Sequence, residues 1–155
     1  MTTETTQQQD WALAQIRKAE QGLRDMRELA GLPPMPQIVC LCGSTRFGAA
    51  FREANLRRTL AGEIVLSIGC DTKTDADLAA AAEFGQDPEA VKADLDQLHR
   101  RKIDLCDYVL VVSDETGYFG QSTAGEIRYA VEHSKPVRFA VAASEERARE
   151  MGLVP

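Results

Sequence analysis

The stretch Tyr108-Val109-Leu110-Val111-Val112 decides the fold class, because it is an unbroken run of apolar and largely β-branched residues. Such residues favour strands, and a run without polar alternation is typical of a strand covered on both faces. Before it, Asp87-Pro88 predicts a helix start that leads to a helix ending near Leu105. After it come a glycine-containing loop, a predicted helix over 123–133 and a predicted strand over 136–141.

The helix expected before this strand carries an apolar stripe made of Val91, Leu95 and Leu98. Further upstream, residues 38–42 form a second unbroken apolar run, residues 47–60 a helical segment and residues 64–68 another strand. Four strands separated by helices predict a three-layer α/β domain with a mostly parallel sheet over 37–155.

The N-terminal part has a different pattern. Residues 1–10 are polar and unpatterned, and we expect a disordered tail there. Residues 11–31 predict an amphipathic helix, and the prolines in 32–36 predict an extended linker. The apolar stripe of this helix is spaced four, three, four, three, four, at Ala12, Ile16, Ala19, Leu23, Met26 and Ala30. So narrow a stripe suits a homo-oligomer contact, and packing on the chain's own domain is an equal alternative.

Composition limits the function classes. The chain has 155 residues, a net charge of −6 and a pI near 5.0, which argues against a general nucleic-acid binder. No apolar run reaches the roughly 18 residues of a membrane span, and the N-terminus has no secretory pattern. We therefore expect a cytoplasmic protein without a membrane partner.

The cysteines give no metal motif. Cys40, Cys42, Cys70 and Cys106 include no C-x-x-C pair, and the two histidines do not stand at zinc spacing from them. We expect reduced cysteines that act as small buried hydrophobes, with no metal and no cofactor.

In a parallel sheet the ligand crevice lies at the carboxyl ends of the strands, so three loops are candidates: 43–47, 69–77 and 113–126. In the first, Gly43, Ser44, Thr45 and Arg46 follow a strand and open a helix, which suits a bound anion. Ordinary turn and cap chemistry explains the same residues equally well.

The second loop places Asp71 and neighbouring carboxylates where sugar hydroxyls could bind, although a solvated loop that caps the next helix is the simpler interpretation. In the third, Gly117 and Gly120 indicate a close backbone approach, and Glu126 lies near a positive helix end that keeps it ionised. The alternative is a capping box between Thr123 and Glu126. On the preceding helix, His99 lies in a basic run that is most simply a solvated face.

Taken together, three segments resemble the nucleoside 2-deoxyribosyltransferase-like superfamily over roughly residues 37–141. They are Cys40-Leu41-Cys42-Gly43-Ser44-Thr45-Arg46, Ile103 to Val112, and Gly120-Gln121-Ser122-Thr123-Ala124-Gly125-Glu126 onward with Lys135-Pro136-Val137. The resemblance implies a flavodoxin-like or Rossmann-like fold, a homo-oligomer and a nucleoside or nucleotide as the small-molecule partner. It also implies that Glu126 is the nucleophile and that Gly43, Ser44 and Arg46 contact a 5′-phosphate.

Two departures from the family pattern matter. An aspartate is expected eight residues before Asp107, and His99 stands there instead. The compact family domain also does not require the N-terminal helix. The catalytic candidates are therefore Glu126, with His99 and Asp71 as acids. The candidate substrate-binding residues are Gly43, Ser44, Thr45, Arg46, Gly117, Gly120, Ser122 and Thr123.

The expected function is cleavage of the N-glycosidic bond of a nucleotide or nucleoside. Three alternatives stay open at this point. One is base exchange between deoxynucleosides. Another is a phosphoribohydrolase of the cytokinin-activating type, against which the missing double glycine counts. The last is a catalytically inactive nucleotide-binding sensor, which the absent aspartate permits.

Overall fold

The computed structural model describes residues 3–68 and 87–155, and the chain divides into two units, residues 1–36 and 37–155. The first unit contains helix α1, Thr3–Leu29. The predicted disordered tail is therefore wrong for residues 3–10, which extend the helix, since threonine and glutamine are tolerated at helical positions when no glycine or proline interrupts them. Among the described residues, no helix combines the length and apolarity needed to span a membrane.

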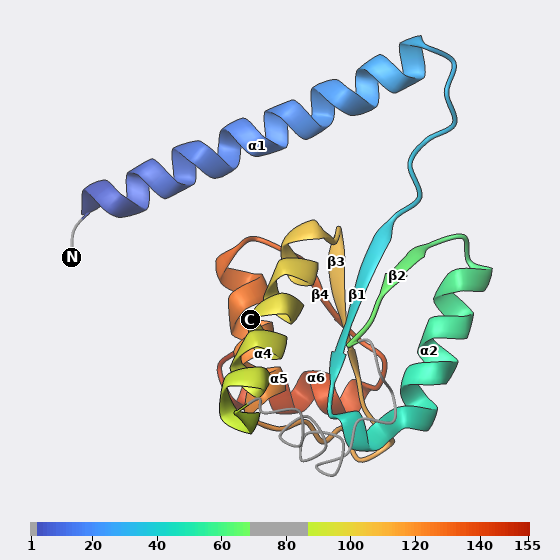
Figure 1. Ribbon diagram of the computed structural model, residues 1–155, viewed down its shortest axis with the longest axis vertical. Coiled ribbons are helices and arrows are strands. Elements are labelled where there is room, and N and C mark those ends of the chain that lie inside the picture. The colour runs from blue at the N-terminus through green and yellow to red at the C-terminus, as the bar shows by residue number, and fades with distance from the viewer. Residues whose placement is uncertain (1–2, 69–86) are drawn as a thin grey trace. The chain divides into compact units, whose positions relative to one another are not determined.

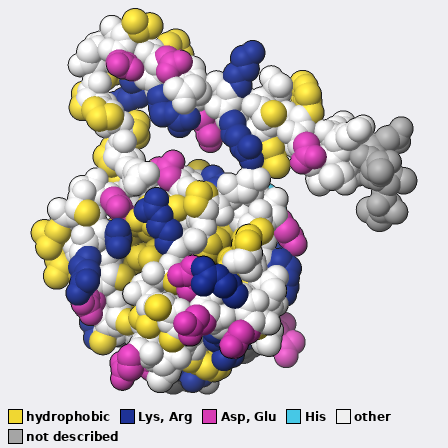
Figure 2. Space-filling view, turned by 180° about the vertical axis from the view of Figure 1, so that it is seen from behind, with side chains coloured by type: hydrophobic (Ala, Val, Ile, Leu, Met, Phe, Trp, Pro, Cys, Tyr) yellow, Lys and Arg dark blue, Asp and Glu magenta, His cyan; other side chains and the backbone are white. Residues whose placement is uncertain are grey.

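The rest of the first unit does not cover the apolar side chains of helix α1. Trp11, Ile16, Leu23, Met26 and Leu29 are each more than half exposed. In Figure 2 such side chains, in yellow, alternate with charged ones along the helix. After Leu29 the chain turns through Gly31, which has a positive φ of 66°. The stripe predicted from the spacing therefore lies on a real helix, and its partner is not part of the chain's first unit.

The second unit is built on four parallel strands in the order β2-β1-β3-β4. They are β1 Ile38–Gly43, β2 Ile64–Leu66, β3 Tyr108–Val112 and β4 Val137–Phe139. This order is the start of the flavodoxin-like arrangement, whose topological switch point lies between β1 and β3. The predicted three-layer α/β fold with a parallel sheet is confirmed (Figure 1).

The helices of this unit cover both faces of the sheet. A short 3-10 helix, Thr45–Phe47, leads into α2, Gly48–Leu60, which covers one face. Helices α4, Pro88–Leu105, and α5, Gln121–Glu132, cover the other, and a further helix, α6, Ala142–Glu150, follows β4 (Figure 1). Helix α6 was not predicted, because its sequence has no apolar stripe: its buried residues are the small Ser144 and Ala148.

The alternation of side chains along β1 and β3 separates two cores. Val39 and Leu41 pack with Phe51 of α2, together with alternate residues of β3. Cys40 and Cys42 point to the opposite face, where they pack with residues of α4 and α5 such as Ile103 and Ile127. Successive residues of a strand point to opposite faces, so one strand supplies both cores.

Helix α4 has the predicted bounds and cap but not the predicted buried face. The Asp87 side chain accepts a hydrogen bond from the Glu89 backbone N–H at 3.2 Å. Leu95 and Leu98, expected to be buried, are exposed. The buried positions are instead His99, Ile103 and Cys106, spaced four and three as one helical face requires.

Candidate functional site

Two of the three expected loops lie at the carboxyl ends of β1 and β3, on either side of the switch point. Residues 43–47 leave β1, and residues 113–120 connect β3 to α5. The second expected loop, 69–77 with Asp71, lies outside the described residues, as do Cys70 and the helix expected after that loop. The site is therefore described from the β1 and β3 side.

Glu126 lies within α5 and not in its first turn. The helix begins at Gln121 with extended Gly120 as its N-cap, so Thr123 is its third residue and Glu126 its sixth. The capping box between Thr123 and Glu126 needs Thr123 at the N-cap, and the structure rules it out. Since the simplest structural explanation of Glu126 is removed, its placement needs another reason.

His99 is buried and faces Glu126, which corrects its expected place on a solvated face. The His99 Nε2 atom lies 3.7 Å from Glu126 Oε1, and the two side chains are 6% and 15% exposed. The neighbouring basic residues Arg100 and Arg101 are exposed, as expected of a basic run. The buried face of α4 passes through position 99, and this is what brings the imidazole onto the sheet.

Cys40 and Cys42 complete the group. His99 Nε2 lies 3.3 Å from Cys42 Sγ and 3.9 Å from Cys40 Sγ. The described cysteines are free and buried, as expected, but these two are more than packing residues. We call Cys40, Cys42, His99 and Glu126 the four-residue cluster. Sequence reasoning missed the cysteines, although their i, i+2 spacing on a strand could have shown that they share a face.

The cluster shifts the protonation of its members. Burial raises the pKa of Glu126 to about 7, against the opposing charge of His99. The expectation that the helix end keeps this carboxyl ionised is therefore too simple, because desolvation outweighs it. Burial lowers the pKa of His99, but the hydrogen bond with Cys40 and the charge of Glu126 outweigh it and raise the pKa overall.

The two thiols respond in opposite directions. A hydrogen bond from Cys42 lowers the pKa of Cys40 to about 6, whereas burial raises the pKa of Cys42 well above its usual value. Two polar atoms of the cluster, His99 Nδ1 and Glu126 Oε2, are buried without a hydrogen-bond partner in the described part of the chain. Unpaired buried polar atoms are costly, and they are common where a ligand binds.

The glycines of the expected binding loops have packing roles. A Cβ at Gly43 would lie 2.3 Å from the Val112 carbonyl oxygen, and Gly117, with φ of 71°, would bring a Cβ within 2.4 Å of the Ala143 backbone. The close approach inferred at Gly117 is therefore to α6, not to a ligand. Gly120 has more room, since its nearest neighbour is the Tyr118 hydroxyl at 3.8 Å.

The phosphate-loop candidates lie beside an aromatic pair that the sequence did not single out. Arg46 is exposed, and its guanidinium stands 4.7 Å from the ring centre of Tyr118. Phe47 meets the same ring edge-on at 6.4 Å, and Arg147 of α6 lies 5.3 Å from it. Arg147 could not be found from sequence because α6 was not predicted. Ser44, extended before the 3-10 helix, makes no capping bond.

Of the other expected binding residues, Thr45 and Ser122 are exposed at this edge and Thr123 is buried. The loops after β1 and β3 thus offer cations, hydroxyls and aromatic rings. Cations and aromatic faces suit a phosphate and a nucleobase, respectively.

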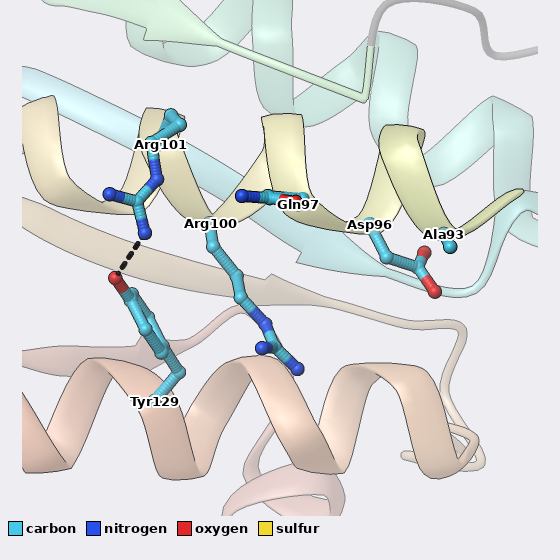
Figure 3. A pocket seen from close by; sticks show the side chains of 6 residues that line it. All are labelled: Ala93, Asp96, Gln97, Arg100, Arg101 and Tyr129. Atoms are coloured by element: carbon cyan, nitrogen blue, oxygen red, sulfur yellow. Dashed lines mark hydrogen bonds between the residues drawn. The ribbon is translucent and has the colours of Figure 1, made fainter. Parts of the chain in front are cut away.

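A separate depression of about 500 Å³ lies between α4 and α5 (Figure 3). It is lined by Ala93, Asp96, Gln97, Arg100, Arg101 and Tyr129. The Tyr129 hydroxyl accepts a hydrogen bond from Arg101 at 3.0 Å and donates one to Asp104 at 2.8 Å. These groups satisfy one another, and neither His99 nor Glu126 lines the depression, so we do not assign the site to it.

Comparison with protein-family models gives no match, and comparison with curated proteins gives none either.

Proposed function

We propose that this protein cleaves the N-glycosidic bond of a nucleotide or nucleoside, with Glu126 as the nucleophile. The observation that carries the proposal is the buried Glu126 carboxyl beside the His99 imidazole, on the helix that follows the loop after β3. In open α/β sheets ligands bind at the loops that follow the carboxyl ends of the strands. The resemblance of three segments to the nucleoside 2-deoxyribosyltransferase-like superfamily points to the same chemistry.

In the proposed reaction the ionised Glu126 attacks the anomeric carbon of the sugar. The carbon–nitrogen bond breaks, its electron pair leaves with the base, and a glycosyl ester forms on the carboxylate. Water then attacks the same carbon, gives its proton to the group that protonated the departing base, and releases the sugar and the free carboxylate. Each step parallels retaining glycoside hydrolysis, in which a carboxylate also bonds to the sugar.

We assign His99 a positioning role on Glu126. Its Nε2 faces Glu126 Oε1 and the two cysteine sulfurs, so this nitrogen is directed at protein groups. A protonated imidazole there favours the ionised carboxylate and opposes the effect of burial. Protonation of the departing base falls to another acid, for which Asp71, outside the described residues, stays a candidate.

Arg46 is our candidate for the 5′-phosphate and Tyr118 for a stacked base. Arg46 is exposed and follows Gly43-Ser44 at the end of β1, and its contact with the Tyr118 ring leaves guanidinium donors for an anion. A phosphate contact of this kind predicts a preference for 5′-nucleotides over nucleosides.

Release of free base from a panel of nucleosides and 5′-nucleotides tests the proposal. We expect activity in the wild type and a loss of roughly 10³-fold or more in Glu126→Gln, as removal of a nucleophile commonly causes. Glu132→Gln is the matched control, since Glu132 lies exposed on the same helix. Absence of release with every compound, together with binding that Glu126→Gln leaves unchanged, refutes the enzyme and supports a sensor.

Adding a second base to the reaction separates hydrolysis from base exchange. A hydrolase gives only free base and sugar, whereas a transferase gives a new nucleoside. In the same assay, Arg46→Ala should lower kcat/KM for 5′-nucleotides by about 10- to 100-fold and leave nucleosides unaffected, because a charged hydrogen bond contributes about 1.5–3 kcal/mol. An equal loss on both substrates argues against a phosphate contact.

We also propose that the exposed apolar stripe of α1 pairs with a second copy of the chain. Its spacing suits a helical seam, and Ile16, Leu23 and Met26 are exposed along it. Light scattering of the wild type and of a variant carrying Ile16→Ser, Leu23→Ser and Met26→Ser tests this. A monomer in both cases excludes the pairing.

A further inference from the structure

Three side chains that can bind a metal ion converge on the face of the sheet covered by α4 and α5. The donor atoms of Cys40, Cys42 and His99 all lie within 4.8 Å of one another, and all three residues are buried. They come from two elements distant in sequence, β1 and α4. Their meeting therefore depends on the fold and not on a local motif, which is why the spacing of the cysteines gave no sign of it.

The distances fit a tetrahedral ion. With zinc bonds of about 2.3 Å to sulfur and about 2.0–2.1 Å to nitrogen or oxygen, the edges of a tetrahedron are roughly 3.6 Å for S···N, 3.8 Å for S···S and 3.3 Å for N···O. The two S···N distances are 3.3 and 3.9 Å, and the distance from His99 Nε2 to Glu126 Oε1 is 3.7 Å. The three edges that meet at His99 Nε2 thus agree with those of a tetrahedral ion to within a few tenths of an ångström.

Glu126 supplies the second indication. Its Oε1 stands beside the same imidazole nitrogen, and its Oε2 is buried with no hydrogen-bond partner among the described residues. A buried carboxylate oxygen without a partner is costly, and a cation would satisfy it. Glu126 lies outside the group whose donor atoms are all within 4.8 Å of one another, so its carboxylate must move toward the sulfurs to take the fourth position of the tetrahedron.

A disulfide between the two cysteines is a poor alternative explanation. Residues i and i+2 of a strand are about 6.6 Å apart. That is near the upper limit of the Cα separation that a disulfide tolerates. Cys40 and Cys42 also hold their strand pairing with β3, opposite Val109 and Val111. A bond between their sulfurs would strain this central strand, whereas a metal ion bridges them without shortening it.

We propose that Cys40, Cys42 and His99 form a binding site for a divalent ion that prefers thiolate ligands, such as Zn²⁺, and that the Glu126 carboxylate moves toward the two sulfurs to complete it. Two sulfurs, one imidazole and one carboxylate are a donor set that suits Zn²⁺ and not Mg²⁺ or Ca²⁺. His99 Nδ1 has no partner in the described part of the chain. Metal-bound histidines usually donate that second nitrogen to an acceptor, so we expect a site weaker than a structural zinc centre.

Occupation of this site affects the reaction proposed above, and this consequence rests on that proposal. A carboxylate that binds the ion is a weaker nucleophile toward the anomeric carbon, because the cation neutralises part of its charge. Zn²⁺ therefore inhibits base release, and a chelator restores it. Metal binding itself does not depend on any activity and is measured separately.

Titration of the reduced, chelator-treated full chain with Co²⁺, a coloured substitute for Zn²⁺, tests the site. We expect one equivalent of Co²⁺ to bind and to give thiolate-to-cobalt absorption together with the intense visible bands of a tetrahedral ion. Addition of Zn²⁺ should displace Co²⁺ and abolish both signals. Cys40→Ser and Cys42→Ser should each weaken binding more than about 100-fold, since even outer-shell partners contribute 10- to 100-fold. Absence of a thiolate band in the wild type overturns the proposal.

Two control variants separate the cluster from other donors. Cys106→Ser replaces a buried cysteine whose thiol donates to the Ile103 carbonyl, and His133→Gln replaces the other histidine. Both should bind Co²⁺ as the wild type does, and a tenfold loss in either contradicts the assignment. X-ray absorption of the Zn²⁺-loaded wild type needs no variant: two sulfur neighbours support the site, and a shell of nitrogen and oxygen alone refutes it.

Discussion

The two faces of the central strand β1 differ in chemistry although they share one backbone. On the α2 face, Val39 and Leu41 pack against Phe51 in an apolar core. On the α4–α5 face, Cys40 and Cys42 meet a buried histidine and a buried carboxyl. The apolar packing of the first face stabilises the fold. The second face buries polar groups, and their burial costs folding free energy. Reactive groups and the groups that hold the sheet together are thus separated by the alternation of a single strand.

The largest effect on stability is expected on the α2 face. Leu41→Ala removes a fully buried side chain and should lower the free energy of unfolding by about 2–5 kcal/mol, because transfer and cavity costs add. Leu56→Ala is the matched control, since Leu56 on α2 is 60% exposed, and should cost far less. Urea unfolding measures both. Equal costs for the two would mean that the α2 face is not the stabilising core.

On the α4–α5 face we expect one substitution, Glu126→Gln, to stabilise the folded state. The pKa of Glu126 is raised from 4.5 to about 7 by burial, so the folded state binds more protons and loses stability as the pH rises through this window. Glu126→Gln removes that loss. At pH 8 the variant should be more stable than the wild type by on the order of 2–3 kcal/mol, given about 1.36 kcal/mol per pKa unit.

The measurement is urea unfolding at pH 5 and pH 8 with a chelator present. The advantage of the variant should be small at pH 5, where the wild-type carboxyl is mostly protonated in the folded state, and should grow toward pH 8. His99, whose pKa is also raised, contributes stability that is lost in the same direction. A variant less stable than the wild type at pH 8 would show that the carboxylate is well satisfied in place.

The smallest effect on stability is expected at the polar edge of the α2 face. The Tyr108 hydroxyl donates to Glu63 Oε2 at 2.6 Å, at the opposite end of the sheet from the site, and Arg138 lies over the Tyr108 ring. A double-mutant cycle of Tyr108→Phe with Glu63→Ala, which removes the acceptor, should give a coupling free energy of about 1 kcal/mol, as single hydrogen bonds do. A coupling free energy of zero would show that the Tyr108–Glu63 hydrogen bond does not contribute to stability.

Local patterns were enough to predict part of the fold. Strand β3 was predicted with its observed bounds because its run is unbroken, and α4 because Asp87-Pro88 is a strong helix start. Helix α6 could not be found, since only Ser144 and Ala148 are buried on it. Strand β4 is also shorter than its apolar run predicted, at Val137–Phe139.

The site was harder to predict than the fold. Glu126 and the Gly43-Ser44-x-Arg46 turn could be named from short motifs, because each depends on neighbours in sequence. The burial of His99 depends on which face of α4 meets the sheet, and Leu95 and Leu98 suggested a different face. Its contact with Cys42 joins residues 57 positions apart, which periodicity within one element cannot indicate.

The close approach of Gly43 to the Val112 carbonyl oxygen limits how this protein can change over evolution. A Cβ at position 43 would collide with backbone, so the last position of β1 is restricted to glycine. Positions 40 and 42 point to one face only and can change without disturbing Val39 or Leu41. Evolution or protein engineering can therefore change the chemistry on one face of this sheet by substituting alternate residues of β1. The residues on the other face keep the domain folded.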